Sequence, residues 1–280
     1  MAEGAAQGTG PESALDTTVS HSARIWNYWL GGKDNFPADR QAGDKVAAML
    51  PSIVAQARAD RAFLGRAIRY LAGEAGILQF LDIGTGLPTA DNTHQVAQRV
   101  APESRIVYAD NDPLVLVHAR ALLTSTPEGA CDYLEGDLHD PDKIIADAAR
   151  TLDFAEPVAL MLLGILHHIC DTDEAYSIVR RLVAALVPGS FLVINHSTSA
   201  IHGAAMEEAV RHWNQVGTPP MTLRTPQQIA RFFDGLDLVA PGVVSCSRWR
   251  PDSSPMTEQP AEVDEFCGVA RKPDRRRAKR

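Results

Sequence analysis

The sequence predicts an α/β fold built on a doubly wound, mostly parallel β-sheet, and three observations support this prediction. From residue 77 onward, short apolar segments alternate with helical patterns, as they do where helices cover both faces of a parallel sheet. The segment FLDIGTGLPT at 80–89 passes from an apolar strand into a glycine-containing turn. Near the end of the chain, two strand patterns follow each other without a helix between them, which indicates an antiparallel pair.

The individual elements of the sheet follow from periodicity and from turn residues. Five strands are expected in the alternating part, at 78–83, 105–110, 131–135, 157–163 and 189–195. The helices between them are expected at 91–100, 113–124, 141–149 and 173–187. Two further helices, at 202–214 and 225–234, lead to strand segments at 236–249 and 265–272, so that the sheet has seven strands.

A helical segment precedes the first strand. Apolar residues at i, i+4 spacing between Ile25 and Leu30 predict a first helix, which ends at Gly31 and Gly32. Two more helical patterns follow, at 39–50 and at 53–72. Residues 1–19 are rich in Gly, Ala, Ser and Thr and are expected to be disordered. The chain therefore divides into a disordered start at 1–19, an N-terminal helical segment at 20–75, a main domain at 76–272 and a basic tail at 273–280.

The glycine turn after the first strand predicts a ligand site. Glycine has no Cβ, so Gly84 and Gly86 allow a ligand to approach the bare backbone. The second strand ends at Asp110, 26 residues after Gly84. Nucleotide-binding folds place an acid that binds a ribose hydroxyl at a similar offset of about 20 residues. The two strand ends together indicate a pocket for a cofactor that contains adenosine.

The residues around this turn favour S-adenosylmethionine over a dinucleotide. A dinucleotide site would have a third glycine where this sequence has Thr89. Asp82 lies immediately before the turn, where a carboxylate would repel a pyrophosphate but would suit an ammonium or sulfonium group. A nicotinamide-dependent dehydrogenase remains a remote alternative.

Composition excludes several classes of protein. The net charge is −8, and residues 1–270 hold 34 acidic and 20 basic residues, so nucleic acid is an unlikely partner for the body of the chain. The last ten residues hold seven basic residues and one acidic residue. The four cysteines form no CxxC motif, which argues against a zinc site. The longest strongly apolar run, 158–166, is shorter than the about 20 residues of a membrane span, and we expect a cytoplasmic protein.

Four elements resemble the class I S-adenosylmethionine-dependent methyltransferases, which have a Rossmann-like sheet. They are DIGTG at 82–86, the acid Asp110, GDL at 136–138 and LGILHHICD at 163–171. The resemblance implies that Asp110 binds the ribose hydroxyls and that Asp137 contacts the adenine amino group. The cofactor-binding residues it implies are Asp82, Gly84, Thr85, Gly86, Asp110, Asn111, Asp137, Leu138 and Gly164.

A narrower resemblance covers nearly the whole chain. RIWNYWLGGKDNFPADR at 24–40, NTHQVAQ at 92–98 and PGSFLVINHST at 188–198 are similar to a bacterial S-adenosyl methyltransferase family long catalogued as a domain of unknown function. This resemblance implies donor binding but leaves the methyl acceptor, the methylated atom and the oligomeric state open.

Two histidines and the N-terminal segment are candidates for the acceptor side of the site. His167 and His168 follow the fourth strand, and a histidine near neutral pKa can take a proton from an acceptor O–H or N–H group. The polar, glycine-containing segment after the first helix is expected to form a lid. Its candidate contacts are Tyr28, Lys33, Asn35 and Arg40, with Arg40 directed to the carboxylate of the donor.

The function that these patterns favour is methyl transfer from S-adenosylmethionine to a small molecule. Because the sulfonium already activates the methyl group, the main task of the protein is to align the acceptor and exclude water. Two alternatives remain open: a non-catalytic regulatory protein that binds the donor, and an RNA or protein methyltransferase that uses the basic tail.

Overall fold

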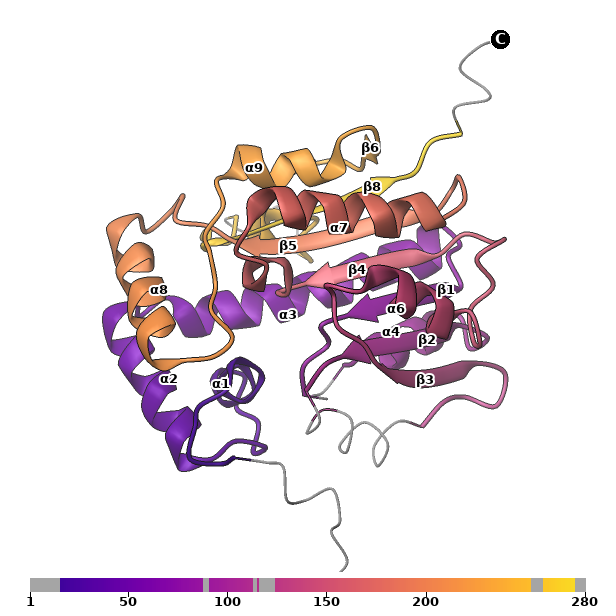
Figure 1. Cartoon of the computed structure of the whole chain (residues 1–280). Coiled ribbons are helices and arrows are strands. Elements are labelled where there is room, and N and C mark those ends of the chain that lie inside the picture. Colours follow the sequence, from indigo (N-terminus) through magenta and orange to yellow (C-terminus); the bar gives the residue numbers. More distant parts are fainter. Residues whose placement is uncertain (1–15, 88–90, 113–114, 116–123, 253–258, 275–280) are drawn as a thin grey trace, which may run out of the picture.

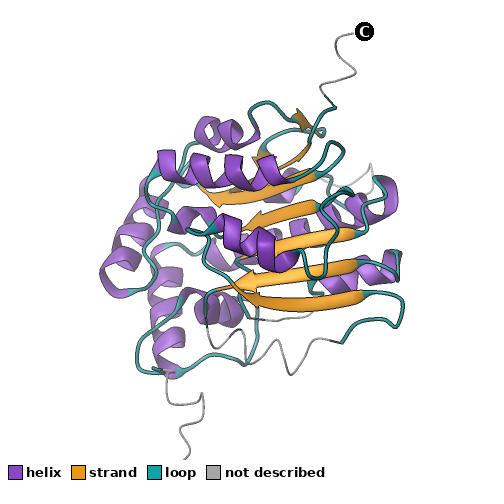
Figure 2. Cartoon of the chain, turned by 45° about the vertical axis from the view of Figure 1, so that its right-hand side comes forward, coloured by secondary structure: helices purple, strands orange, loops and turns teal. Residues whose placement is uncertain are grey.

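A single mixed β-sheet forms the centre of the molecule. The computed structural model describes residues 16–87, 91–112, 115, 124–252 and 259–274. The strand order is β3-β2-β1-β4-β5-β8-β6, and β7 pairs with β8. The parallel strands are β1 (Gln79–Ile83), β2 (Arg105–Asp110), β3 (Ala130–Glu135), β4 (Ala159–Leu163) and β5 (Phe191–Ser197). The predicted doubly wound, mostly parallel sheet is confirmed, and Figure 2 shows helices on both of its faces.

The C-terminal edge of the sheet is antiparallel, as expected, but it has one more strand than the sequence predicted. Strand β8 (Glu265–Arg271) runs antiparallel to β5. The segment expected as one strand at 236–249 contains two short strands, β6 (Asp237–Leu238) and β7 (Val244–Ser245), which both pair with β8. Pro241 has no N–H group to donate, and Gly242 has φ +90°, so the chain turns between the two strands. The described part of the sheet therefore has eight strands.

The helices lie close to their expected positions. The N-terminal helices are α1 (Ser22–Trp29), α2 (Pro37–Met49) and α3 (Ile53–Arg69), and α3 continues into a short π-helix at Tyr70–Glu74. The later helices are α4 (Thr93–Val100), α6 (Pro141–Ala148), α7 (Thr172–Ala185), α8 (Ala204–Val216) and α9 (Pro226–Ala230). Most of the helix expected at 113–124 lies outside the described residues.

Alternation along the strands divides the core between the two faces of the sheet. Leu81 and Ile83 of β1 pack into a cluster with residues of α6 and α7, whereas Phe80 packs on the other face with residues of α3 and α4. Phe63 and Ile68 of α3 are fully buried in this second cluster, so α3 belongs to the core of the sheet. The division of the chain at residue 75 stays a prediction.

The other N-terminal helices pack against α8 beyond the carboxyl ends of the strands. Figure 1 shows α2 beside α8, although the two helices are far apart in the sequence. A third apolar cluster joins these helices, with Val46 and Leu50 from the end of α2 and Met206 and Val210 from α8. This arrangement leaves a space between the helices and the edge of the sheet.

A buried ion pair connects α1 to α2. The Nε of Arg24 lies 2.9 Å from Oδ2 and 3.0 Å from Oδ1 of Asp39, and the two residues are 3% and 0% exposed. The same carboxylate accepts hydrogen bonds from the backbone N–H groups of His21 and Phe36. Arg24 also donates to the carbonyl oxygen of Val19. Asp39 therefore satisfies donors from three parts of the N-terminal segment.

We expect the substitution Asp39→Ala to destabilise the protein by about 3–5 kcal/mol, because it leaves the Arg24 guanidinium buried without its anion. Urea unfolding of the variant measures this loss. The matched control is Arg181→Ala, which removes the exposed pair of Arg181 with Asp142 and should change stability by less than about 1 kcal/mol. Equal effects of the two substitutions would contradict a structural role for the buried pair.

Candidate functional site

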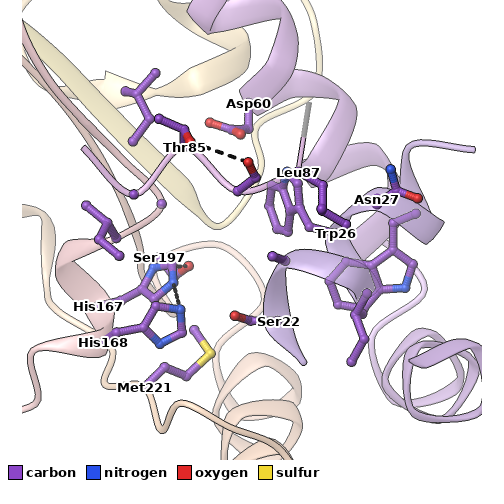
Figure 3. Close-up of a pocket in the computed structure, with 18 of the residues that line it drawn as sticks. Ser22, Trp26, Asn27, Asp60, Thr85, Leu87, His167, His168, Ser197 and Met221 are labelled. Atoms are coloured by element: carbon purple, nitrogen blue, oxygen red, sulfur yellow. Dashed lines mark hydrogen bonds between the residues drawn. The ribbon is translucent and has the colours of Figure 1, made fainter. Parts of the chain in front are cut away.

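A cavity of about 440 Å³ lies between the carboxyl ends of the strands and the N-terminal helices. One side consists of the loops after β1, β2 and β4. The opposite side consists of apolar residues of α1, α2 and α8. Within α1 and α8 these residues recur three or four positions apart, so each of these helices presents one apolar face to the cavity. The residues on that side include Ile25, Trp26, Trp29, Val46, Leu50, Met206, Ala209, Val210 and Trp213. Figure 3 shows Trp26 and Leu87 facing the histidines and Met221 across this space.

The glycine turn after β1 holds the first of the predicted contacts. Gly84 has φ +76° and Gly86 has φ +62°, a region that favours glycine. A Cβ on Gly84 would lie 2.5 Å from Cγ1 of Ile165, so this turn packs directly against the loop after β4. The two loops therefore form one continuous wall of the cavity.

Asp110 is fixed by backbone donors at the end of β2. Its Oδ2 accepts a hydrogen bond of 2.8 Å from the N–H of Gly86, and its Oδ1 accepts one of 3.0 Å from the N–H of Asp112. Burial raises the pKa of this carboxyl group above its usual range. The bond to Gly86 joins the two predicted parts of the adenosine pocket, which come from different strands.

Asp82 lies at the end of β1 and is 5% exposed. Its Oδ2 accepts a hydrogen bond of 2.6 Å from Oγ1 of Thr93, so the residue also holds the start of α4. Burial raises the pKa of Asp82 to about 6. A nearby positive charge would stabilise the ionised form of this buried carboxyl group.

Sequence reasoning missed a second acid beside Asp82. Asp60 of α3 lines the cavity, and burial raises its pKa to about 7. It accepts a hydrogen bond from Nδ2 of Asn195, whose Oδ1 in turn accepts one from the N–H of Gly164. Gln56, Asp60 and Leu64 all line the cavity and follow i, i+4 spacing along α3. The two polar residues on this otherwise apolar helix face are the sequence signal that could have identified Asp60 as a site residue.

His167 and His168 lie in a short 3₁₀ turn after β4, and both line the cavity. Their Nε2 atoms are 3.2 Å apart, and Nδ1 of His168 donates to the carbonyl oxygen of Pro220 at 2.9 Å. Figure 3 shows the two rings side by side, with a dashed line between them. Burial lowers the pKa of His168 to about 4, and it lowers the pKa of His167 well below its usual range. His196 points away, because its Nε2 contacts Nη1 of Arg224 at 2.7 Å.

The structure brings seven of the nine predicted cofactor residues to the cavity. These are Asp82, Gly84, Thr85, Gly86, Asp110, Asn111 and Gly164. Asp137 and Leu138 are not among the lining residues: the Asp137 side chain is half exposed and accepts hydrogen bonds from His139, and Leu138 is buried in the core. A contact between Asp137 and the adenine stays a prediction.

The four predicted lid contacts also lie away from the cavity lining. Tyr28 donates from its hydroxyl group to Asp44 at 2.8 Å. Nη1 of Arg40 donates to the carbonyl oxygen of Asn35 at 2.9 Å and to its side-chain oxygen at 3.0 Å, and Lys33 is exposed. Instead, α1 faces the cavity with Ser22, Ile25, Trp26 and Trp29, which are spaced at i, i+3, i+4 and i+7. A lid role for this segment stays a prediction.

The comparison with known families decides between the possible adenosine cofactors. Residues 8–273 match the model of a family described as S-adenosyl methyltransferase. The chain belongs to the S-adenosyl methyltransferase family. S-adenosylmethionine is therefore its cofactor, as the sequence predicted, and the lining fits it, with a bare backbone turn and several acids.

Solved structures agree with this family. A DUF574 family protein from Streptomyces avermitilis is 45% identical with a TM-score of 0.86, and the match covers 92% of this chain and 99% of that chain. A protein from Thermobifida fusca described as a candidate methyltransferase is 40% identical with a TM-score of 0.85, over 95% of this chain and 100% of that chain. An O-methyltransferase family protein from Burkholderia thailandensis, 16% identical with a TM-score of 0.51 over 85% of this chain and 61% of that chain, shares the fold. A search of the curated proteins found no match.

In the described residues of this methyltransferase family member, no group of three or more His, Cys, Asp and Glu side chains is placed to hold a metal ion. No helix in the described ranges is long and apolar enough to cross a membrane.

We expect the affinity for S-adenosylmethionine to increase as the pH rises from 5 to 7.5. The pKa values of Asp82 and Asp60 are raised to about 6 and about 7, so both groups are mostly neutral at pH 5 and become ionised over this range. The ionised form favours the cationic donor, and because one pKa unit corresponds to a tenfold change, the Kd should fall by about tenfold or more. Calorimetric titration measures this change. The variant Asp60→Asn should flatten the profile, and an unchanged wild-type Kd would contradict the expectation.

We expect Gly84→Ala to lower stability by at least about 2 kcal/mol and to abolish donor binding, since the new Cβ would be both strained at φ +76° and too close to Ile165. Gly76→Ala is the matched control, because Gly76 has φ +69° and no heavy atom within 4 Å of an added Cβ. It should cost only about 1–2 kcal/mol and leave binding unchanged. Thermal unfolding and calorimetry of both variants separate strain from the contact with Ile165.

Proposed function

We propose that this chain transfers the methyl group of S-adenosylmethionine to a small, largely apolar acceptor molecule. The observation that carries the proposal is the division of the cavity into a polar side at the sheet and an apolar side at the helices. The polar side suits the adenosine and the charged end of the donor. The apolar side, made by α1, α2 and α8, extends beyond what the donor needs for recognition and is suited to a second, apolar ligand.

The residues of the polar side have separate tasks in this proposal. Asp110 holds the ribose hydroxyls, since its position is fixed by the N–H groups of Gly86 and Asp112. Asp82 and Asp60 lie near the positive charge of the donor, and Gly84 and Gly164 offer backbone contacts. When bound, the donor supplies a methyl group that its sulfonium has already activated, so the protein has mainly to position the two ligands.

His167 and His168 are the candidate catalytic residues, because both line the cavity, with Ser197 on one side of them and Met221 on the other (Figure 3). Their lowered pKa values keep both rings neutral, and a neutral imidazole can accept a proton. They would take the proton that an acceptor O–H or N–H group loses when the methyl group is added.

The other functions fit the cavity less well. The lining residues contributed by α2 and α8, together with Thr218, Pro219 and Met221, are uncharged, which does not suit the phosphates of RNA. A protein that only bound the donor would not need the apolar lining that α1, α2 and α8 provide. The role of the tail at 273–280 and the cytoplasmic location stay predictions.

Calorimetric titration with S-adenosylhomocysteine tests the first part of the proposal, which is that the chain binds the donor. We expect micromolar binding to the wild type and a loss of about 10–100-fold in Asp110→Ala, since hydrogen bonds to a charged group contribute about 1.5–3 kcal/mol. Asp142→Ala, at an exposed position on α6, is the control and should bind like the wild type.

Transfer itself is tested with radiolabelled S-adenosylmethionine and a panel of small apolar phenols and amines. Label should appear in at least one organic-soluble product, and short RNA and the chain's own lysines should stay unlabelled. Absent binding of S-adenosylhomocysteine would refute the donor site, and label in RNA alone would refute the small-molecule acceptor.

A further inference from the structure

A continuous series of side-chain contacts leads from the cavity to a buried acid. Nε2 of His168 lies 3.2 Å from Nε2 of His167, and Nδ1 of His167 lies 3.4 Å from Oγ of Ser197. Oγ of Ser197 lies 2.8 Å from Oε2 of Glu265, which is 1% exposed on β8. The four residues come from the turn after β4, from β5 and from β8, and Figure 3 shows the part from Ser197 to His168.

The backbone determines the proton positions at the cavity end of this series. The carbonyl oxygen of Pro220 can only accept, so Nδ1 of His168 carries a hydrogen, and Nε2 of the neutral ring has a free lone pair. That lone pair faces Nε2 of His167 at hydrogen-bond distance. There is room for one proton between the two Nε2 atoms, and two bare nitrogens there would repel each other.

The far end of the series has two consistent states. With a proton between the histidines and a neutral His167, Nδ1 of His167 accepts from Ser197, and Ser197 accepts from a protonated Glu265. With Glu265 ionised and no proton between the histidines, each of these hydrogen bonds reverses: His167 donates from Nδ1 to Ser197, and Ser197 donates to the carboxylate. The two bare Nε2 atoms then face each other, and their repulsion favours the uptake of a proton between them. The hydroxyl group of Ser197 can take both roles without moving.

We propose that Glu265, acting through Ser197, is the positioning residue that finally holds the proton which the acceptor gives to the His167–His168 pair. This inference rests on the proposed function, and it specifies that the acceptor is a protic group, an O–H or N–H. The balanced step starts from the state with Glu265 ionised and both Nε2 atoms bare: the acceptor atom bonds to the methyl carbon, the carbon–sulfur bond breaks with its electron pair on sulfur, and the acceptor proton enters the space between the two Nε2 atoms. A proton then passes from Nδ1 of His167 to Ser197, and the Ser197 proton passes to Glu265.

The surroundings of Glu265 support this role. Its other recorded hydrogen bond comes from Nε2 of Gln56 at 3.0 Å, a neutral donor from α3. Asp60 and Asp264 are the acids near it, and the buried thiols of Cys246 and Cys267 also lie close. Burial, together with these two acids, raises the pKa of Glu265 well above the usual range. Among the described residues, no cation forms an ion pair with Glu265. A carboxyl group in such a place takes up a proton readily.

The groups that face the histidines act in the opposite direction. His196 and Arg224 lie near His167, and His21 lies near His168, and each lowers the pKa of the ring that it faces. The imidazoles therefore do not retain a positive charge easily. A proton that reaches the pair is better held on Glu265, where it removes a buried negative charge instead of adding a buried positive one.

Nitrogen NMR of histidine-labelled protein with S-adenosylhomocysteine tests the inference without a known acceptor. The spectra report which ring nitrogen of His167 carries hydrogen, and the His168→Gln variant assigns the signals. In the wild type, we expect His167 to change from the Nε2–H form to the Nδ1–H form as the pH rises through the pKa of Glu265. In Glu265→Gln this titration should disappear, because the amide cannot exchange a proton with Ser197 over this range.

Two further variants keep the test decisive. Ser197→Ala interrupts the series while it leaves the carboxyl group, and it should also abolish the titration. Asp264→Asn is the control, because it removes a neighbouring buried acid that is not part of the series. The midpoint of the His167 titration should stay within about 0.5 pH unit of the wild type, whereas loss of a coupled partner should shift it by about one pH unit or more. A wild-type titration in both Glu265→Gln and Ser197→Ala would overturn the inference.

Calorimetry on the same samples distinguishes this outcome from failure of the proposed function. If the wild type does not bind S-adenosylhomocysteine, the donor site is refuted, whatever the histidines do. If all variants bind it as the wild type does and the titration still persists without Glu265, only the proton route is refuted.

Discussion

The burial of acids around the cavity is the constraint on which the rest of the site depends. Asp60, Asp82 and Asp110 reach it from α3, β1 and β2, and burial raises the pKa of each. Arg61 and several hydrogen-bond donors offset part of this effect, but desolvation is the largest influence on all three. A ligand with a sulfonium and an ammonium group supplies the positive charge that this arrangement favours. Donor binding and the protonation of the site are therefore one coupled equilibrium.

Strand β5 connects this donor side to the acceptor side. Side chains two residues apart on a strand point to the same face, so Asn195 and Ser197 both face the cavity region while His196 faces Arg224. Asn195 joins Asp60 to the N–H of Gly164, and Ser197 joins His167 to Glu265. A displacement of the end of β5 would therefore affect the acids near the donor and the histidines near the acceptor together.

The parts of the site that were predictable from sequence are those that local pattern determines. The strand ends, the glycine turn and Asp110 follow from periodicity and from the conformational freedom of glycine, and the structure places them along one cavity. Asp60 and Glu265 were not predictable in this way, because their position depends on how α3 and β8 pack against distant strands.

The sequence predicts one strand at 236–249 where the structure has two, because apolar residues continue across Pro241 and Gly242. The predicted lid contacts bond within their own segment, while the apolar face of α1 turns to the cavity.

The apolar side of the cavity depends on long-range packing more than any other part. Its lining comes from α1 and α2 at one end of the chain and from α8, more than 150 residues later, and these helices share one small apolar cluster. The residues of this cluster are separate from the cores on the two faces of the sheet, and the Arg24–Asp39 pair adds a buried connection between α1 and α2. Substitutions along α8 can therefore alter the shape of the acceptor side while the sheet and the donor loops keep their structure. This separation gives a physical reason why one donor-binding sheet can serve acceptors of different shape.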